Sequence, residues 1–202
     1  MIEIQSISKA FEDRKLFEDY SLTIEDGEFI IFTGVSGCGK TTLLNMIGSI
    51  EPIDSGKILV DSSDISKRKN QTKYLKTKVG FLFQNFALID NKTVKENLTI
   101  VKNDCRSDVG IEEALEKVGL QDKIKQRVYS LSGGEQQRVA LARLMVKKCD
   151  IILADEPTGS LDRGNAETLF DLLEDLNKSG KTVIVVTHDE HFKNRGSRVI
   201  SL

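Results

Sequence analysis

The sequence predicts an α/β fold built on a mostly parallel sheet. Three short apolar runs, at residues 29–32, 151–154 and 183–186, are each bounded by turn residues. Continuous runs of this length suit strands that are buried on both faces, as in a parallel sheet covered by helices. Helical patterns separate each run from the next, which is typical of the α/β class.

The N-terminal part follows a different pattern. Residues 3–28 and 57–61 alternate apolar and polar side chains. Such alternation predicts shorter strands that expose one face. We expect these strands to form an antiparallel edge of the sheet and thus an N-terminal antiparallel β subdomain.

The middle of the chain predicts a helical insertion. Residues 85–148 have strong helical character and no comparably strand-like run. One predicted helix carries four apolar residues on a single face, namely Ile111, Ala114, Leu115 and Val118. We expect one domain over residues 1–202, with a core made of residues 1–84 and 149–202 and the insertion between them.

The composition indicates an ordinary globular chain of the cytoplasm. Of the 202 residues, 39% are hydrophobic and 30% charged, which is too apolar for a disordered protein. The net charge of −2 argues against a nucleic-acid binder, which normally has a basic excess. The sequence has no apolar run of about 18 residues and no secretory signal. Three cysteines at no ligand-like spacing suit a reducing compartment. From the length of 202 residues, we expect the chain to be only part of any transporter.

A phosphate-binding loop follows the first apolar run. Residues 34–41 fit the pattern G-x-x-x-x-G-K-[ST] between a predicted strand and an apolar helix. Glycines let backbone N–H groups surround an anion, and the helix N-terminus adds a positive dipole. Lys40 supplies a charge for the β- and γ-phosphates, and Thr41 supplies a hydroxyl for Mg²⁺. The pattern predicts a nucleoside-triphosphate site, and the simpler alternative is a glycine-rich turn.

Cys38 lies within this loop, at a predicted helix N-terminus where a thiol can be acidified. We interpret it as a small residue that fills the loop rather than as a redox switch. The nucleotide contacts expected from the loop are Gly34, Ser36, Gly37, Cys38, Gly39, Lys40, Thr41 and Thr42.

Two carboxylates follow the second apolar run. Asp155 and Glu156 stand where the buried strand is expected to end, and parallel sheets bind ligands at the carboxyl ends of their strands. Asp155 is then placed to hold Mg²⁺ together with Thr41, and Glu156 to polarise a water for attack on the γ-phosphate. A solvated acidic turn is the alternative, and the upstream loop favours the functional interpretation.

Residues 131–138 read Leu-Ser-Gly-Gly-Glu-Gln-Gln-Arg and open a predicted helix. A lone Ser-Gly-Gly before a helix is usually only a cap. The whole octapeptide, however, resembles the signature of ABC-type ATPases. The phosphate loop, signature, Asp-Glu strand end and a terminal histidine follow the order of that family over essentially the entire chain. The resemblance implies a P-loop NTPase fold of the ABC type and ATP hydrolysis.

The resemblance implies further roles. Phe11 looks like the aromatic residue that stacks on adenine, with a core phenylalanine as the alternative. Gln84 looks like the glutamine that touches Mg²⁺ or the attacking water, and a solvated loop residue is its alternative. His188 looks like the switch histidine that bonds the γ-phosphate, whereas His191 is interpreted as a surface residue. Residues 160–162 look like the D-loop that runs along a partner subunit, although Ser160 stands where relatives often have Asn.

In this family two subunits pack head to tail. The resemblance therefore implies that Ser132 and Gly134 of one subunit face the γ-phosphate held by Lys40 of the other. ATP binding would join the homodimer, and hydrolysis with Glu156 would release it, by the logic of a phosphate-held switch.

The residues of these motifs look most like those in one branch of the family, which contains the lipoprotein-release, macrolide-export and bacteriocin-export ATPases. Their permeases are separate membrane proteins, which implies a peripheral location on the inner face of a bacterial cell membrane. Phe86, Ala87, Leu88 and Ile89 would line the groove for the permease, and a core patch is the alternative. No nucleic-acid partner is expected, and many relatives continue beyond the position where residue 202 ends this sequence.

Other functions stay open at this point. A division-type ATPase would clamp a membrane protein without transport, a repair or translation ATPase would act near nucleic acid, and a P-loop kinase would phosphorylate a metabolite. A kinase function would leave the signature octapeptide without a role. ATPases that act near nucleic acid carry coiled coils, zinc modules or tandem ATPase units, and the sequence shows none of these. Six cations at residues 67–78, without an acid, suit either anionic lipid head groups or a solvated face.

Overall fold

The computed structural model describes residues 1–12, 14–159 and 161–202. Within them a parallel sheet with the strand order β6-β7-β8-β3-β9 forms the centre of the molecule. Its strands are β3 (Phe29–Thr33), β6 (Val79–Leu82), β7 (Ile151–Asp155), β8 (Thr182–Val186) and β9 (Arg198–Ser201). The three apolar runs form β3, β7 and β8, so their prediction as buried parallel strands is confirmed.

Strands β6 and β9 carry weaker signals in the sequence. Gly80 interrupts the apolar run of β6, and β9 lies at the sheet edge with exposed residues. An edge strand needs no apolar face toward a second neighbour, so its pattern is difficult to recognise.

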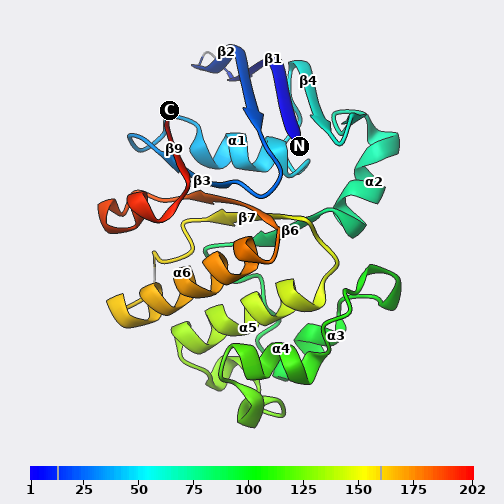
Figure 1. Ribbon diagram of the computed structural model, residues 1–202, viewed down its shortest axis with the longest axis vertical. Helices are drawn as coiled ribbons and strands as arrows, with labels where there is room; N and C mark the ends of the chain where they lie inside the picture. Colours follow the sequence, from blue (N-terminus) through cyan, green and yellow to red (C-terminus); the bar gives the residue numbers. More distant parts are fainter. Residues whose placement is uncertain (13, 160) are drawn as a thin grey trace.

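The N-terminal strands form a sheet of their own. It has the order β2-β1-β4-β5, made of β1 (Ile2–Phe11), β2 (Arg14–Ile24), β4 (Ser55–Val60) and β5 (Ser63–Asp64). The antiparallel pairing is confirmed, whereas the expectation that these strands form an edge of the parallel sheet is wrong. The physical reason is helix α1 (Lys40–Ile47), which lies between the two sheets in Figure 1 and packs against both.

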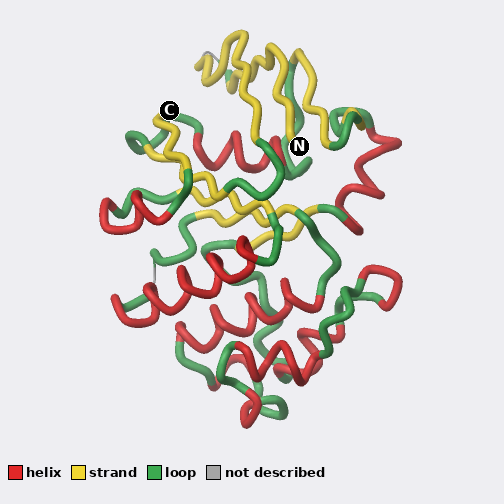
Figure 2. The backbone as a smooth tube through the Cα atoms, viewed as in Figure 1, coloured by secondary structure: helices red, strands yellow, loops and turns green. Residues whose placement is uncertain are grey.

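Helices cover the other face of the parallel sheet. They are α3 (Val94–Thr99), α4 (Ile111–Lys117), α5 (Gly133–Val146) and α6 (Arg163–Lys178), and Figures 1 and 2 show them stacked below the sheet. Short 3₁₀ turns are η1 (Asn103–Cys105), η2 (Gln121–Lys123), η3 (Val128–Ser130) and η4 (Glu190–Arg195). The helical character of residues 85–148 is therefore confirmed.

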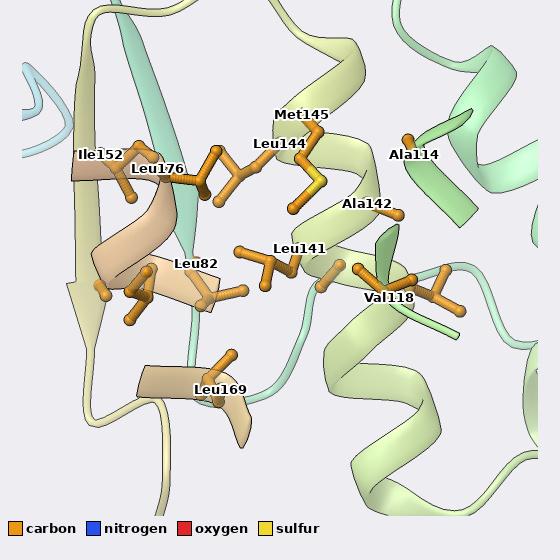
Figure 3. Packing of buried hydrophobic residues seen from close by; sticks show 14 of the residues in the cluster. Leu82, Ala114, Val118, Leu141, Ala142, Leu144, Met145, Ile152, Leu169 and Leu176 are labelled. Carbon is orange, nitrogen blue, oxygen red and sulfur yellow. The ribbon is translucent and has the colours of Figure 1, made fainter. Parts of the chain in front are cut away.

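One hydrophobic cluster joins these helices to the sheet. Figure 3 shows Leu141 and Leu144 of α5 between Leu82 and Ile152 of the sheet and the apolar residues of α4. Ala114, Leu115 and Val118 are buried in the same cluster. This continuity supports the expectation that residues 85–148 are an insertion rather than a separate domain.

The basic run forms most of helix α2 (Arg68–Thr77), which leads into β6. Ion pairs engage Lys67 with Asp64, Lys76 with Asp104, and Lys78 with both Asp61 and Asp150. This pairing favours a solvated face over a lipid contact. Within the described ranges, no helix is both long enough and apolar enough to cross a membrane.

Candidate functional site

A cavity of about 650 Å³ opens where the phosphate loop meets the ends of β7 and β8. Its lining comes from four regions: the tip of the β1–β2 hairpin, the loop and first turn of α1, the residue after β7 and the loop after β8. The lining residues are Phe11, Arg14, Leu16, Ser36, Gly37, Gly39, Lys40, Thr41, Thr42, Glu156 and His188. The carboxyl ends of neighbouring parallel strands meet at this edge of the sheet, which places their terminal residues together.

The loop owes its shape to glycines with positive φ. Gly37 has φ 79° and Gly39 has φ 104°, and α1 begins directly afterwards at Lys40. A methyl group on Gly39 would lie 2.9 Å from two ring carbons of Phe17. Both the dihedral angle and the close approach therefore require glycine at position 39.

Lys40 is only 8% exposed and lies within the loop. Its ammonium donates hydrogen bonds of 2.9 Å to the carbonyl oxygens of Gly34 and Val35. Its Nζ also lies 3.6 Å from the sulfur of Cys38. Neither Gly34 nor Cys38 lines the cavity, and this packing suits the interpretation of Cys38 as a filling residue.

Thr41 and Asp155 join the loop to the end of β7. The Thr41 hydroxyl donates a 2.9 Å hydrogen bond to the Asp155 carboxylate. Burial raises the pKa of Asp155, and the Thr41 hydrogen bond opposes that shift. A hydroxyl and a carboxylate side by side are hard oxygen donors, the kind that Mg²⁺ prefers with waters and phosphates completing its shell. The pair therefore fits a Mg²⁺ site.

Glu156 and His188 both line the cavity and are in contact with one another. A Glu156 carboxylate oxygen lies 2.8 Å from Nδ1 of His188. The Glu156 backbone has φ 43°, and its N–H donates to the Val186 carbonyl at the end of β8. The hydrogen bond and charge of Glu156 raise the pKa of His188, whose side chain is 73% exposed. The contact therefore favours the protonated imidazole of His188.

Phe11 lies at the rim of the cavity. It is 46% exposed, so the alternative of a core phenylalanine is excluded. The Lys9 ammonium lies 4.7 Å from its ring centroid. Arg14 completes this side by donating a 2.7 Å hydrogen bond to the Gly37 carbonyl. Arg14 was not predicted from the sequence, because a single arginine at the start of a strand belongs to no motif.

Gln84 does not line the cavity. It is exposed, and a methyl group on Gly159 would lie 3.2 Å from its Nε2, so its amide lies beside the D-loop. Asp162 of that loop caps α6 by accepting a 2.9 Å hydrogen bond from the Asn165 backbone. Ser160 lies outside the described residues.

Ser132 and Gly134 also lie away from their own chain's cavity. Ser132 is the N-cap of α5 and forms a reciprocal capping box with Glu135, at 3.3 Å and 2.8 Å. A methyl group on Gly134 would come within 2.7 Å of Asn165, so the start of α5 packs closely on the start of α6. The Ser-Gly-Gly sequence is thus a helix cap in this chain, in which Ser132 is exposed and Gly134 is buried.

The segment after Gln84 is partly exposed. Phe86 and Leu88 pack against the main hydrophobic cluster, whereas Ala87 is exposed and Ile89 is 41% exposed. The four residues expected to line a permease groove therefore divide between core packing and surface. His191 is exposed, as expected, and lies against Glu167 of α6.

Comparisons with known proteins agree with this geometry. The family described as ABC transporter matches residues 17–159. The chain is 37% identical to "Uncharacterized ABC transporter ATP-binding protein YvrO" of Bacillus subtilis (strain 168), over 99% of this chain and 92% of that protein. It is 39% identical to "Cell division ATP-binding protein FtsE" of Escherichia coli (strain K12), over 100% of this chain and 95% of that protein.

A third relative is much longer. The chain is 35% identical to "Macrolide export ATP-binding/permease protein MacB" of Campylobacter jejuni, over 100% of this chain but only 33% of that protein. Among solved structures, the one described as "Dimeric Structure of MJ0796, a Bacterial ABC Transporter Cassette" is 35% identical with a TM-score of 0.86, covering 100% of this chain and 94% of that chain. A second structure of that cassette is a dimeric post-hydrolysis state bound to ADP and Pi, with the same TM-score of 0.86.

Proposed function

The chain belongs to the ABC transporter family and is an ATP hydrolase of the ABC type, and from this premise we propose that it powers a separate membrane permease. The observation that carries the proposal is the meeting of the phosphate loop, the Thr41–Asp155 pair and the Glu156–His188 pair at one cavity. We assign it to export of peptide, bacteriocin, lipoprotein or drug. The MacB relative supports this assignment, because its name combines macrolide export, ATP binding and a permease in one protein.

ATP binds with its base at Phe11 and its phosphates at the loop. The exposed ring of Phe11 offers a stacking face at the rim, and stacking on an aromatic side chain suits any base. The phosphates lie against the loop and the first turn of α1, where Lys40 exchanges its carbonyl partners for phosphate oxygens. Ser36, Gly37 and Thr42, which line the cavity, complete this contact.

Thr41 and Asp155 would hold Mg²⁺, and Gln84 would be a further oxygen donor to it. Bound Mg²⁺ neutralises part of the negative charge that develops on the phosphates. The hydrogen bond between Thr41 and Asp155 keeps both oxygens at one point in the site. Gln84 is exposed beside Gly159 and does not line the cavity, so this role requires its side chain to turn toward the cavity.

Glu156 accepts a proton from the attacking water. The water oxygen forms a bond to the γ-phosphorus while the bond to the bridging oxygen breaks, which yields ADP and inorganic phosphate. His188, with its raised pKa, donates a hydrogen bond to the γ-phosphate and holds the Glu156 carboxylate in place. The two side chains act as a pair because they are already in contact.

Two copies of the chain complete the sites. Ser132 is exposed at the start of α5, away from its own cavity, whereas Gly134 is buried there. Ser132 contacts the γ-phosphate bound to the partner's loop, and Gly134 reaches it through its backbone. The dimeric cassette structures of a 35% identical relative support this head-to-tail homodimer. The γ-phosphate then biases a closed against an open dimer.

The permease contacts residues 86–89. Ala87 and Ile89 are exposed there beside the half-buried Phe86 and Leu88, which gives an apolar surface next to Gln84. Through this contact the chain takes a peripheral position on the inner face of the cell membrane.

A division-type function is the second candidate, in which the ATPase clamps a membrane protein without moving cargo. The FtsE relative favours it, with 39% identity over 95% of that protein. Purifying the tagged chain from membranes tests the partner, and a co-purified multi-span membrane protein is expected in both cases. Reconstitution of that complex in vesicles with ATP separates them, because cargo movement supports export and its absence supports mechanical signalling. Recovery of the chain without any membrane protein would contradict both.

A further inference from the structure

Two partly buried cations stand where α5 ends, one in its last turn and one at its C-cap. They are Arg143 and Lys147, and neither forms an ion pair with a carboxylate in the part of the chain that the structure describes. Burial lowers the pKa of both side chains. A buried charge without a counter-charge is retained in a fold only where other polar groups satisfy it. In this chain, backbone carbonyl oxygens satisfy both cations.

Arg143 binds the segment that follows Gln84. Its two terminal nitrogens donate hydrogen bonds of 2.9 Å and 2.6 Å to the carbonyl oxygens of Phe86 and Ala87. These two residues have φ values of 61° and 47°, in the left-handed region that L-residues adopt only at an energetic cost. Such a conformation persists only where its surroundings hold it, and the guanidinium fork does so.

Lys147 binds the chain just before β6. Its ammonium donates hydrogen bonds of 2.8 Å to the Leu75 carbonyl at the end of α2 and 2.6 Å to the Val79 carbonyl. Between the two cations, α5 approaches β6 closely, because a methyl group on Gly80 would lie 2.3 Å from a Leu144 methyl carbon. The end of α5 thus contacts strand β6 at three places. Lys147 binds the start of the strand, Leu144 packs on its middle, and Arg143 binds the segment that follows it.

We propose that Arg143 and Lys147 are positioning residues that fix the segment carrying Gln84 to the signature helix, so that the two move as one unit. The inference rests on the roles proposed above for Gln84 and Ser132. Ser132 caps the beginning of α5, and Arg143 and Lys147 lie near its end. A contact of Ser132 with the partner's γ-phosphate therefore displaces Gln84 through a single rigid helix. The permease surface at residues 86–89 is held by the same arginine.

Amide hydrogen exchange of the full nucleotide-free chain tests the attachment directly. The amides of Phe86, Ala87 and Ile89 are reporters, because each donates a hydrogen bond to a local acceptor. In Arg143→Met we expect at least tenfold faster exchange at these amides, with exchange of the phosphate loop unchanged. Arg143→Lys keeps the charge but not the fork, so an intermediate value is expected. Lys147→Met is expected to accelerate exchange at the start of β6.

Arg127→Met is the matched control. Arg127 also donates to a backbone carbonyl, that of Asn91, but over 3.4 Å on an exposed surface. Its loss is expected to leave the exchange of residues 83–89 unchanged. If Arg143→Met does not fold, Arg143→Lys carries the test alone.

Steady-state kinetics separate this inference from the proposed function. We expect Arg143→Lys to lower kcat several-fold while KM for ATP stays within about twofold, because the phosphate loop is untouched. Faster exchange at residues 86–89 without any change in kcat would support the attachment and overturn the role of Gln84. Unchanged exchange at these residues, or an equal acceleration throughout the chain, would overturn the attachment itself.

Discussion

Gly39→Ala tests the geometry of the phosphate loop. Two effects oppose alanine at this position, and the structure separates them. The first is the φ of 104°, which an L-residue adopts with difficulty. The second is the Phe17 ring, whose two nearest carbons would lie 2.9 Å from the new methyl group.

The expected loss follows from these two effects. Positive φ costs an L-residue about 1–2 kcal/mol, and overpacking costs about 1–3 kcal/mol. Together they amount to about 2–5 kcal/mol. If the loop recovers its native shape only when ATP binds, the dissociation constant for ATP rises between about 30-fold and several thousand-fold.

Titration of each variant with a fluorescent ATP analogue measures the effect. Gly37→Ala is the matched control, since its φ is also positive, at 79°, but its nearest neighbour is an Arg14 nitrogen at 3.4 Å. We expect Gly37→Ala to weaken binding less than Gly39→Ala. The double variant Gly39→Ala/Phe17→Leu removes the distal ring carbons, so it is expected to recover part of the affinity lost in Gly39→Ala.

Two results would refute this reasoning. One is an affinity of Gly39→Ala within threefold of the native chain. The other is equal loss in Gly37→Ala and Gly39→Ala with no recovery in the double variant, which would mean that Phe17 does not constrain the loop.

Two further predictions concern the rim and the pair at the strand ends. Phe11→Ala is expected to weaken ATP binding about 5- to 150-fold, from about 1–3 kcal/mol of base stacking, while Phe11→Tyr retains affinity; equal affinity of all three chains would exclude stacking at Phe11. The pKa of His188 is raised in the folded chain, so its contribution to stability is complete below the unfolded value of about 6.5 and is lost as pH rises through the folded pKa. His188→Ala should therefore lower Tm more at pH 6 than at pH 9. The corresponding loss in free energy of unfolding is expected to stay below about 1 kcal/mol because the side chain is largely exposed, and a larger effect at pH 9 would contradict the pairing with Glu156.

The sequence predicted the parts of the site that follow strong local rules. The phosphate loop, Asp155, Glu156 and His188 stand directly after apolar runs, and a parallel sheet brings the ends of such runs together. The order of the apolar runs and the phosphate-loop motif therefore predicted that the loop, Asp155 and Glu156 lie together, and the family resemblance added His188. Ser132 was recognisable as a helix cap, because Glu135 stands three residues later.

Other features depend on contacts between distant segments. The separation of the antiparallel strands into their own sheet results from the packing of α1 between the two sheets, which no local pattern records. Arg14 lines the cavity only because its hairpin folds over Gly37. Arg143 and Lys147 are indistinguishable in sequence from solvated helix cations, and only tertiary contacts reveal that backbone carbonyls are their partners.

ATP hydrolysis at sites shared between two chains is the central proposal for this protein. Light scattering of Glu156→Gln, with and without ATP and Mg²⁺, tests this directly alongside phosphate release. We predict a stable dimer only with ATP, no turnover, and loss of that dimer when Ser132→Arg is added to the same chain. A Glu156→Gln chain that stays monomeric with ATP, hydrolyses ATP at the native rate, or dimerises equally well with Ser132→Arg would contradict the account.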